Sequence, residues 1–245
     1  MKRGNSNPRG PCGGKAGTSY TELLERKMTG IPRPENVTTK IQRVANLAKE
    51  ATGMAFTSLS HHIDLEYLQK AYRRTRKDGA VGVDGQTAEE YKYAAELDAN
   101  LESLLNRFKS GTYKAPPVRR VHIPKGDGRK TRPIGIPSFE DKVLQRATVM
   151  MLEAIYEQDF LDCSYGFRPG RSALQAVDAL RSDLMNMRGG WVLEVDIQDF
   201  FGSLNFSHLR SFLDSRVRDG VIRRTIDKWL TAKSGSTGRR ANNTP

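Results

Sequence analysis

The stretch Trp191-Val-Leu-Glu-Val-Asp-Ile-Gln-Asp-Phe-Phe201 decides how this chain is interpreted. From Trp191 to Ile197 apolar residues alternate along the sequence, which is the period of a β-strand. The alternation places Asp196 on the less apolar face, just before Phe200 and Phe201. We therefore expect a strand at 191–197 that ends with a carboxylate beside two aromatic rings.

Two interpretations of this segment stay open from its residues alone. A carboxylate at the end of a strand, followed by bulky aromatics, is how nucleotide polymerases place a metal ion beside a nucleotide sugar. Asp196 would then bind metal, and the Phe201 ring would exclude a 2′-hydroxyl. Asp199 would share the site only if the chain turns after Ile197, because a continuing strand points it the other way. The alternative is a half-buried strand with solvated acids and aromatic rings packed in a core.

Composition limits the partners and the compartment. The 245 residues carry a net charge of +12, and 37% of them are hydrophobic. This charge predicts nucleic acid as the partner, ahead of an anionic membrane. No apolar run approaches the roughly 18 residues of a membrane span, and no apolar stretch follows the basic N-terminus as in a secretory signal. The two cysteines, Cys12 and Cys163, lie in unlike contexts. We expect a cytoplasmic protein without a membrane partner.

The positive charge is clustered on both sides of the Asp196 segment. Nine Lys or Arg residues lie between Arg107 and Arg132 against one acid, and eight lie between Arg216 and Arg240 against two. Such clusters are typical of solvated faces, but two of them around one strand favour the walls of a phosphate-lined channel. Four of these residues are expected to contact the phosphate backbone of RNA: Arg119, Arg120, Lys125 and Arg132.

Helices dominate the expected secondary structure, and the order of elements is that of an α+β domain. The expected helices lie at about 39–51, 65–77, 88–110, 139–155, 173–184, 207–218 and 221–232, with side-chain caps from Asp64, Thr87, Ser138 and Ser172. Two strands, 118–123 and 132–136, are joined by a turn that contains Asp-Gly. Residues 1–35 are expected to be a disordered basic extension, and residues 233–245 an irregular tail.

The loop Ser164-Tyr-Gly-Phe-Arg-Pro-Gly-Arg171 is a second candidate contact for nucleic acid. Its two glycines allow close approach of a backbone, and Tyr165, Phe167, Arg168 and Arg171 are suited to stacking or to phosphate contacts. The alternative is a packed connector with Phe167 buried.

Three strings of this sequence resemble successive motifs of the reverse transcriptases encoded by group II introns. They are Val118-Arg-Arg-Val-His-Ile-Pro-Lys-Gly-Asp-Gly-Arg-Lys-Thr-Arg-Pro-Ile-Gly-Ile-Pro137, Ser164-Tyr-Gly-Phe-Arg-Pro-Gly-Arg-Ser172 and Val195-Asp-Ile-Gln-Asp-Phe-Phe201. The resemblance covers about residues 36–232. It implies a right-hand polymerase fold with fingers at 36–190 and the first part of the palm at 191–232.

The same resemblance implies a function and its partners. These are RNA-directed DNA synthesis within a mobile element, maturase activity on the bound intron RNA, and a site for two Mg²⁺ ions. The partners would be an intron RNA template, a DNA primer and deoxynucleoside triphosphates. Asp196 matches the family's first metal-binding aspartate and Phe201 its aromatic nucleotide gate. Lys125 and Arg132 match the cations of the fingers near the triphosphate.

The sequence also departs from the family's pattern. The family usually has Asp and His at the positions of Gly202 and Phe206. In the family these two residues look like supports of the site's geometry and not like participants in its chemistry. The next motifs, Gly-Thr-Pro-Gln-Gly-Gly and Tyr-Ala-Asp-Asp, are absent from the sequence. We therefore expect a polymerase truncated before its second aspartate motif and inactive alone, which a second polypeptide could complete. A non-catalytic RNA-binding fragment is the alternative. An unrelated basic RNA-binding protein would explain the charge but not the ordered motifs.

Overall fold

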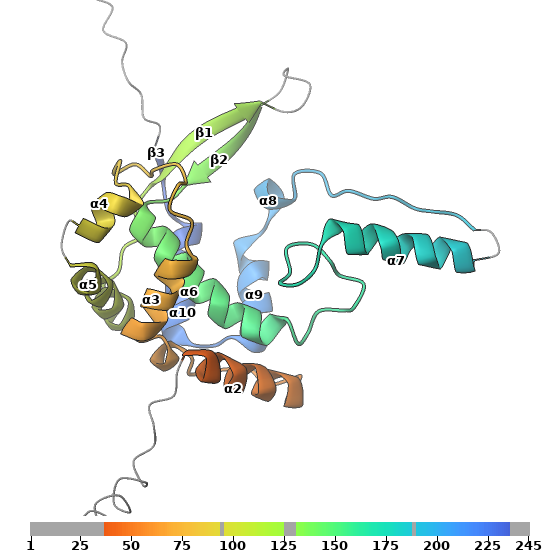
Figure 1. Cartoon of the computed structure of the whole chain (residues 1–245), viewed down its shortest axis with the longest axis horizontal. Coiled ribbons are helices and arrows are strands. Elements are labelled where there is room, and N and C mark those ends of the chain that lie inside the picture. The colour runs from red at the N-terminus through yellow and green to blue at the C-terminus, as the bar shows by residue number, and fades with distance from the viewer. Residues whose placement is uncertain (1–36, 94–95, 125–130, 188–189, 236–245) are drawn as a thin grey trace, which may run out of the picture. The chain divides into compact units, whose positions relative to one another are not determined.

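The computed structural model describes residues 37–93, 96–124, 131–187 and 190–235. These residues form mixed helical and strand structure (Figure 1). The helices are α2 (Val37–Glu50), α3 (Leu65–Arg74), α4 (Ala88–Tyr93), α5 (Leu97–Ser110), α6 (Phe139–Tyr156), α7 (Ala173–Asn186), α8 (Phe200–Ser203), α9 (Phe206–Arg216) and α10 (Gly220–Leu230), with a 3₁₀ turn at Ser60–His62. The strands are β1 (Val118–Pro124), β2 (Thr131–Ile136) and β3 (Ser234–Gly235). The extension predicted at 1–35 lies outside the described residues.

Most helices begin and end where the sequence predicts. Asp64 precedes α3, and its carboxylate accepts a hydrogen bond from the backbone N–H of Tyr67 at 2.9 Å. Ser172 and Gln175 each accept from the other's backbone N–H, which forms a capping box at the start of α7. Gly111 ends α5 with a φ of 77°, a left-handed conformation that glycine adopts without steric cost. Local side-chain chemistry is therefore sufficient to set these boundaries.

The predicted long helix after Thr87 is wrong, because two helices, α4 and α5, occupy this region. α4 ends at Tyr93, and Glu96 has an extended ψ of 135° before α5 begins. The Asn100 side chain donates to the carbonyl of Tyr91 at 2.7 Å. That carbonyl lies in the last turn of α4, where the helix itself provides no partner. Asn100 therefore stabilises the break between the two helices.

The start of α9 also differs from the prediction. Asn205 is the residue before the helix, and its side chain accepts a hydrogen bond from the backbone N–H of Ser207 at 2.8 Å. The Ser207 hydroxyl donates to the same Asn205 oxygen at 2.7 Å, so Ser207, where the sequence predicts the helix to begin, lies inside it. Asparagine is among the best capping residues, so the helix begins one residue earlier.

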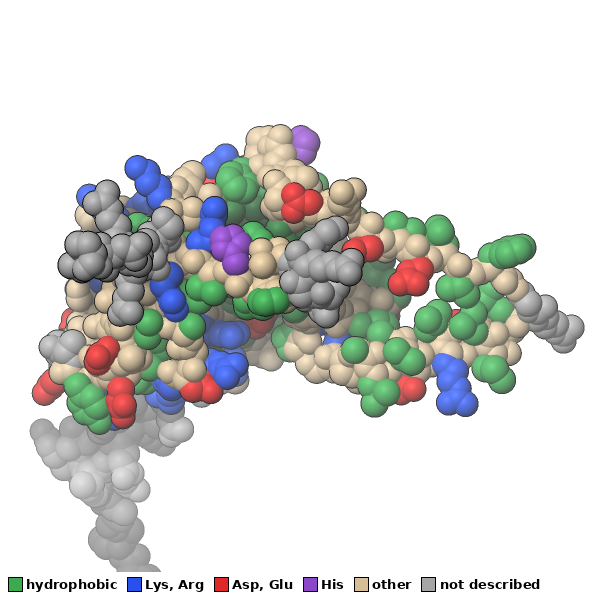
Figure 2. Space-filling view, turned by 90° about the horizontal axis from the view of Figure 1, so that it is seen from above, with side chains coloured by type: hydrophobic (Ala, Val, Ile, Leu, Met, Phe, Trp, Pro, Cys, Tyr) green, Lys and Arg blue, Asp and Glu red, His purple; other side chains and the backbone are tan. Residues whose placement is uncertain are grey.

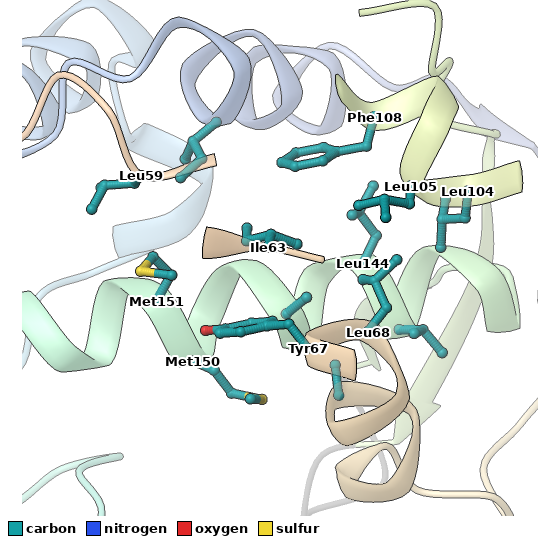
Figure 3. Packing of buried hydrophobic residues seen from close by; sticks show 14 of the residues in the cluster. Leu59, Ile63, Tyr67, Leu68, Leu104, Leu105, Phe108, Leu144, Met150 and Met151 are labelled. Carbon is teal, nitrogen blue, oxygen red and sulfur yellow. The ribbon is translucent and has the colours of Figure 1, made fainter. Parts of the chain in front are cut away.

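The hydrophobic core lies where α3, α5 and α6 meet the segment that precedes α3 (Figure 3). Completely or nearly completely buried side chains from these elements pack together: Leu59, Ile63, Tyr67 and Leu68, then Leu104 and Phe108, then Leu144, Met150 and Met151. Burying one such side chain contributes about 1.5–3 kcal/mol to stability. Ten residues of α6 are buried, so α6 is the central helix of this body.

The sheet is small and built around β1. β1 pairs antiparallel with β2, as the predicted hairpin requires, and the register places Arg120 opposite Gly135 and Ile123 opposite Arg132. β3 pairs parallel with β1, with Val118 opposite Ser234, which gives the strand order β2-β1-β3. The predicted irregular tail thus begins with a two-residue strand, because Ser234 and Gly235 find a free edge of β1. Residues 236–245 lie outside the described part of the chain.

Two buried charged residues hold the link between α9 and α10 against the N-terminal helices. Arg216 is 5% exposed and bonds to Asp159 at 2.8 Å. Its guanidinium also donates to four carbonyls at and after the end of α2, those of Ala48, Ala51, Thr52 and Met54, at 2.8–3.0 Å. A guanidinium supplies five donors in a planar fork, so one side chain satisfies several orphan helix carbonyls.

Asp219 completes this link from the other side. Its carboxylate accepts from the backbone N–H groups of Val221 and Ile222, which begin α10, and from those of Leu59 and Ser60, all at 2.7–3.0 Å. Burial alone would raise the pKa of Asp219, but the hydrogen bonds from Ser60, Leu59 and Ile222 outweigh it and hold the pKa below its ordinary value. The carboxylate therefore stabilises the fold in its charged form.

A third buried group joins α10 to α6. Trp229 donates from Nε1 to Asp141 Oδ1 at 2.7 Å, and the Tyr113 hydroxyl donates to the same oxygen. Burial raises the pKa of Asp141, although the hydrogen bonds from Tyr113 and Trp229 oppose the shift. Lys228 adds two bonds, to the carbonyls of Gly111 and Tyr113, both at 2.7 Å. The C-terminal helix is thus fixed to the body by polar contacts as well as by packing.

The predicted strand at 191–197 is wrong in this structure. Residues 190–197 form no regular secondary structure, and every side chain from Trp191 to Phe201 is exposed. α7 likewise has no buried residue, although its apolar residues have helical spacing. Figure 2 shows hydrophobic side chains gathered along this projecting part of the chain. A strand forms only when another strand satisfies its backbone groups, and no described residue pairs with this segment.

Among the described helices, none is long and apolar enough to cross a membrane. The cytoplasmic location stays a prediction.

Candidate nucleotide and nucleic-acid site

Asp196 lies on the exposed, unpaired segment between α7 and α8. Its side chain has no hydrogen-bond or ion-pair partner among the described residues. After Ile197 the chain does turn, because Asp199 has a φ of 46° and lies directly before α8. A Cβ at position 202 would lie 2.3 Å from Asp199 Oδ2, so a larger residue there would require the exposed Asp199 side chain to move. Glycine at position 202, where the family usually has Asp, is therefore compatible with the observed position of the Asp199 side chain.

The described carboxylates do not form a metal site by themselves. No group of three or more His, Cys, Asp or Glu side chains lies close enough to hold an ion within 37–93, 96–124, 131–187 and 190–235. Asp196 and Asp199 offer two carboxylates at most, whereas two Mg²⁺ ions would require further oxygen ligands. The fit of Mg²⁺ to this part of the chain is therefore incomplete, and the role of Asp196 as a metal ligand stays a prediction.

The two phenylalanines after Asp199 form an exposed aromatic pair. Their ring centroids lie 5.2 Å apart with an interplanar angle of 71°, an edge-to-face arrangement. Phe201 is 86% exposed and Phe200 is 47% exposed. Neither ring is buried, so the alternative in which the aromatic rings pack in a core does not hold in this structure. Phe201 is free to contact a ligand.

The hairpin of β1 and β2 separates the predicted cations onto two faces. Cross-strand partners share a face of a sheet, and faces alternate along each strand. The observed register therefore places Arg119 and Arg132 on one face, together with the partly exposed Ile123 and Ile134, and Arg120 on the other. This separation follows from residue parity and was available from the sequence. Lys125 lies outside the described residues.

Arg119 and Arg132 differ in their surroundings. Arg119 is partly buried, and its Nε donates to the carbonyl of Val81 at 2.9 Å, which ties the hairpin to the segment after α3. Arg132 is exposed near the outer end of the hairpin and has no partner among the described residues. A free guanidinium on a firm strand is suited to bidentate contact with phosphate oxygens. Arg132 is thus better placed than Arg119 to bind a triphosphate.

Arg168 holds the loop at 157–171 together. Its side chain is 7% exposed, and its guanidinium pairs with Glu157 at 3.2 Å and donates to the carbonyls of Leu161 and Ser164 at 2.9 and 2.7 Å. It also lies 4.9 Å from the ring centroid of Phe160. These contacts give Arg168 a structural role within the loop, and its contact with nucleic acid stays a prediction.

Tyr165 and Arg171 form a more accessible pair in the same loop. The Arg171 guanidinium lies 5.3 Å from the Tyr165 ring centroid and 3.4 Å from Asp162. Phe167, which was expected to be buried in one interpretation, is fully exposed and has a φ of 58°. A left-handed conformation is uncommon for a bulky residue. The exposed Phe167 ring contradicts the alternative of a packed connector, and its stacking on nucleic acid stays a prediction.

Comparison with known proteins identifies a domain that contains most of these candidate residues. The sequence model described as reverse transcriptase (RNA-dependent DNA polymerase) matches residues 123–244. This span contains Arg132, the 164–171 loop, Asp196 and Phe201. It defines the class of the protein as one that contains a reverse transcriptase domain.

Curated relatives narrow the class. Protein YkfC of Escherichia coli (strain K12) is 36% identical over 176 residues, which are 69% of this chain and 45% of that protein. The group II intron-encoded protein LtrA of Lactococcus lactis subsp. cremoris is 30% identical over 196 residues, 78% of this chain and 32% of LtrA. Nuclear intron maturase 1, mitochondrial, of Arabidopsis thaliana is 26% identical over 128 residues, 50% of this chain and 18% of the maturase.

The chain belongs to the family of group II intron-encoded reverse transcriptases and maturases. An unrelated basic RNA-binding protein, the third hypothesis from the sequence, is thereby set aside. The chain spans less than half the length of the relatives named above.

Proposed function

We propose that this chain supplies the fingers, at 36–190, and the first part of the palm, at 191–232, of an RNA-directed DNA polymerase of group II intron type. Its partners would be an intron RNA template, a DNA primer and deoxynucleoside triphosphates, and it would act as a maturase on the bound intron RNA. The observation that carries this proposal is the exposed apolar surface around Asp196, together with the family of the chain.

That surface consists of apolar residues typical of a protein core, but these residues are exposed. The exposed apolar residues are Leu174, Val177, Leu180 and Leu184 on α7 and Trp191, Val192, Leu193, Val195 and Ile197 on the segment that follows. Contiguous apolar patches on soluble proteins mark interaction sites, and the backbone of 190–197 lacks strand partners. We infer that a further polypeptide covers this surface, pairs with the Asp196 segment and supplies the remaining carboxylates of the site.

Within the completed site each predicted residue would have a separate role. Arg132 and Lys125 would neutralise the charge of the triphosphate, and Phe201 would lie against the sugar, where its ring leaves no room for a 2′-hydroxyl. Asp196 would be one of the ligands of two Mg²⁺ ions, which in this class of enzyme favour attack of the primer hydroxyl on the α-phosphate. Arg119, Arg120, Tyr165, Arg168 and Arg171 would contact template or primer, with Arg168 acting from its position within the loop.

A complementation assay tests this proposal. The 245-residue chain would be mixed with a separate polypeptide from a relative such as LtrA that begins after the matched segment. Primer extension would be measured on an RNA template with Mg²⁺ and deoxynucleotides. We expect no extension by either polypeptide alone and extension by the mixture. Asp196→Asn should abolish it, whereas Asp183→Asn, a matched loss of an exposed carboxylate on α7, should not.

The same assay separates the roles of the other residues. Phe201→Val should raise the incorporation of ribonucleotides relative to deoxynucleotides, because the smaller side chain leaves space beside the 2′ position. Strong extension by the 245-residue chain alone would contradict the need for a second polypeptide. Unchanged extension with Asp196→Asn would contradict the metal-ligand role.

A non-catalytic RNA-binding fragment is the second candidate. The net charge of +12 and the absence of a metal-binding cluster among the described residues favour it. It would be supported if the chain binds structured RNA with a steep dependence on salt but no complementing polypeptide restores extension.

A further inference from the structure

A cationic cleft lies away from the Asp196 segment, between α6 and the segment that follows α3. Its volume is about 350 Å³, and its lining includes Arg76, Lys142 and Arg146 but no acidic residue. Lys142 and Arg146 are four residues apart on α6, so they lie on the same face of the helix. Gly79 forms part of the opposite wall, where a Cβ would lie 3.9 Å from Lys142 Nζ.

The wall opposite α6 is held in a fixed position. Thr75 is buried and its hydroxyl bonds to the carbonyl of Ala71 at 2.8 Å. Lys142 donates to the carbonyl of Ala80 at 2.5 Å. The backbone at Gly82 comes so close to α6 that a Cβ would lie 2.6 Å from the Cα of Ser138. Only glycine permits this approach, so Gly82 allows the segment after α3 to lie directly against the start of α6.

The cations of the cleft are available to an anionic ligand. Arg146 is exposed and has no partner among the described residues. Arg76 pairs with Asp78, but both side chains are more than 70% exposed, and exposed pairs exchange readily because each is worth little. Burial lowers the pKa of Lys142, Arg119 lowers it further, and Asp84 opposes the shift. A phosphate beside Lys142 would offset the cost of this charge.

Arg119 links the hairpin of β1 and β2 to the segment that forms one wall of the cleft. Arg119 lies on the same hairpin face as Arg132 and donates to the carbonyl of Val81, two residues after Gly79 of the cleft wall. One strand of nucleic acid could therefore contact cations on the hairpin face and then those in the cleft. Backbone phosphates, and not bases, are the groups that guanidinium and ammonium donors hold without sequence preference.

We propose that the cleft between Arg76 and the Lys142–Arg146 face of α6 binds consecutive phosphodiester groups of an RNA strand. This proposal rests on the proposed function for the identity of the strand. It adds a phosphate-binding site, built by Arg76, Lys142 and Arg146, to the residues that the sequence predicts.

The test compares two double variants with equal net charge. Lys142→Gln/Arg146→Gln removes two cations from the cleft, and Lys49→Gln/Arg181→Gln removes two exposed cations from α2 and α7, so both lower the net charge from +12 to +10 (12 − 2 = 10). The affinity of each full chain for a fluorescein-labelled single-stranded RNA would be measured by anisotropy over a range of salt concentrations. Circular dichroism would verify that each variant is folded.

The cleft variant should bind about 20-fold more weakly at 0.1 M salt, because each phosphate contact on a single strand contributes about 0.7 log units there. The slope of log K against log salt should become shallower by about 1.4, again about 0.7 for each contact. The control variant should change both far less. Lys142 also bonds to the carbonyl of Ala80, so its replacement removes a structural contact as well. Arg146→Gln alone avoids this effect and should weaken RNA binding about 5-fold.

Each other outcome has a defined meaning. Equal losses in the cleft and control variants would overturn the cleft while leaving RNA binding by the chain intact. If the cleft variant loses affinity for inorganic triphosphate but not for RNA, the site binds free phosphate and not a strand, and the proposal is wrong. If the unmodified chain binds no RNA, the cleft and the RNA-binding part of the proposed function both fail. The primer-extension assay is independent of these results.

Discussion

Helices α6 and α7 have the same sequence signals for helix formation, but α6 is largely buried and α7 is exposed. Both begin after a serine whose hydroxyl accepts from the backbone three residues on, and both carry apolar residues at helical spacing. Ten residues of α6 are buried, whereas α7 buries none. The capping residue and the periodicity therefore predict that a helix forms, but burial depends on whether a complementary surface is present.

The same contrast holds for the strands. β1 finds β2 across a short connection and β3 at its other edge, so its backbone groups are paired. The segment at 191–197 has the stronger alternation of apolar residues but no partner among the described residues, and it stays exposed without regular secondary structure. A period of two thus indicates which residues would share a face, and the partner decides whether a strand exists.

The largest expected difference between α6 and α7 is in the loss of stability caused by one Leu→Ala substitution in each helix. Leu144→Ala removes a side chain with no exposed surface from α6 and should lower the free energy of unfolding by about 3 kcal/mol, because it leaves a cavity in the core. Leu180→Ala on α7, where the side chain is 50% exposed, should change it by less than about 0.5 kcal/mol. Urea titration followed by circular dichroism measures both. Similar losses in the two variants would show that α7 packs in solution, and the contrast would be wrong.

The helix caps provide the second test. Asp219→Ala removes a cap from α10 and leaves the buried N–H of Leu59 without a partner, so a loss of about 2 kcal/mol is expected. Ser172→Ala, the matched change at the start of α7, should leave the urea midpoint of the body unchanged, because α7 contributes no buried residue.

The pH dependence of the Asp219 effect sharpens this test. The pKa of Asp219 is held below its ordinary value, so its contribution is present above that ordinary value and is lost as pH falls through the lowered pKa. The difference in stability between the unmodified chain and Asp219→Ala should therefore be largest near neutral pH and shrink in acid. A difference that stays constant from neutral pH to about pH 3 would contradict the charged role of this carboxylate.

The sequence predicted most of the body and less of the site, for physical reasons. Helix boundaries depend on neighbours within four residues, so Asp64, Ser172 and Gly111 were sufficient to predict them. The buried bonds of Arg216 and Asp219 join residues more than 150 positions apart, and nothing local to either residue predicts them. For the site, the parity of Arg119, Arg120 and Arg132 could be derived from the sequence. The environment of Asp196 could not, because it depends on a surface that the described residues do not supply.

Fluorescence of the two tryptophans gives the smallest expected effect and the most direct view of the contrast. Trp191 lies in the exposed segment and is 99% exposed, whereas Trp229 is partly buried and bonded to Asp141. Comparison of the unmodified chain with Trp191→Phe isolates the Trp191 signal, which should be quenched freely by acrylamide and hardly change when urea unfolds the body. The remaining Trp229 signal should be protected and should shift to longer wavelength on unfolding.

Adding the complementing polypeptide should protect Trp191 and leave Trp229 unchanged, because only the surface around Asp196 would become covered. Protection of Trp191 in the free chain would mean that this surface is already packed, and the need for a second polypeptide would then lose its structural basis.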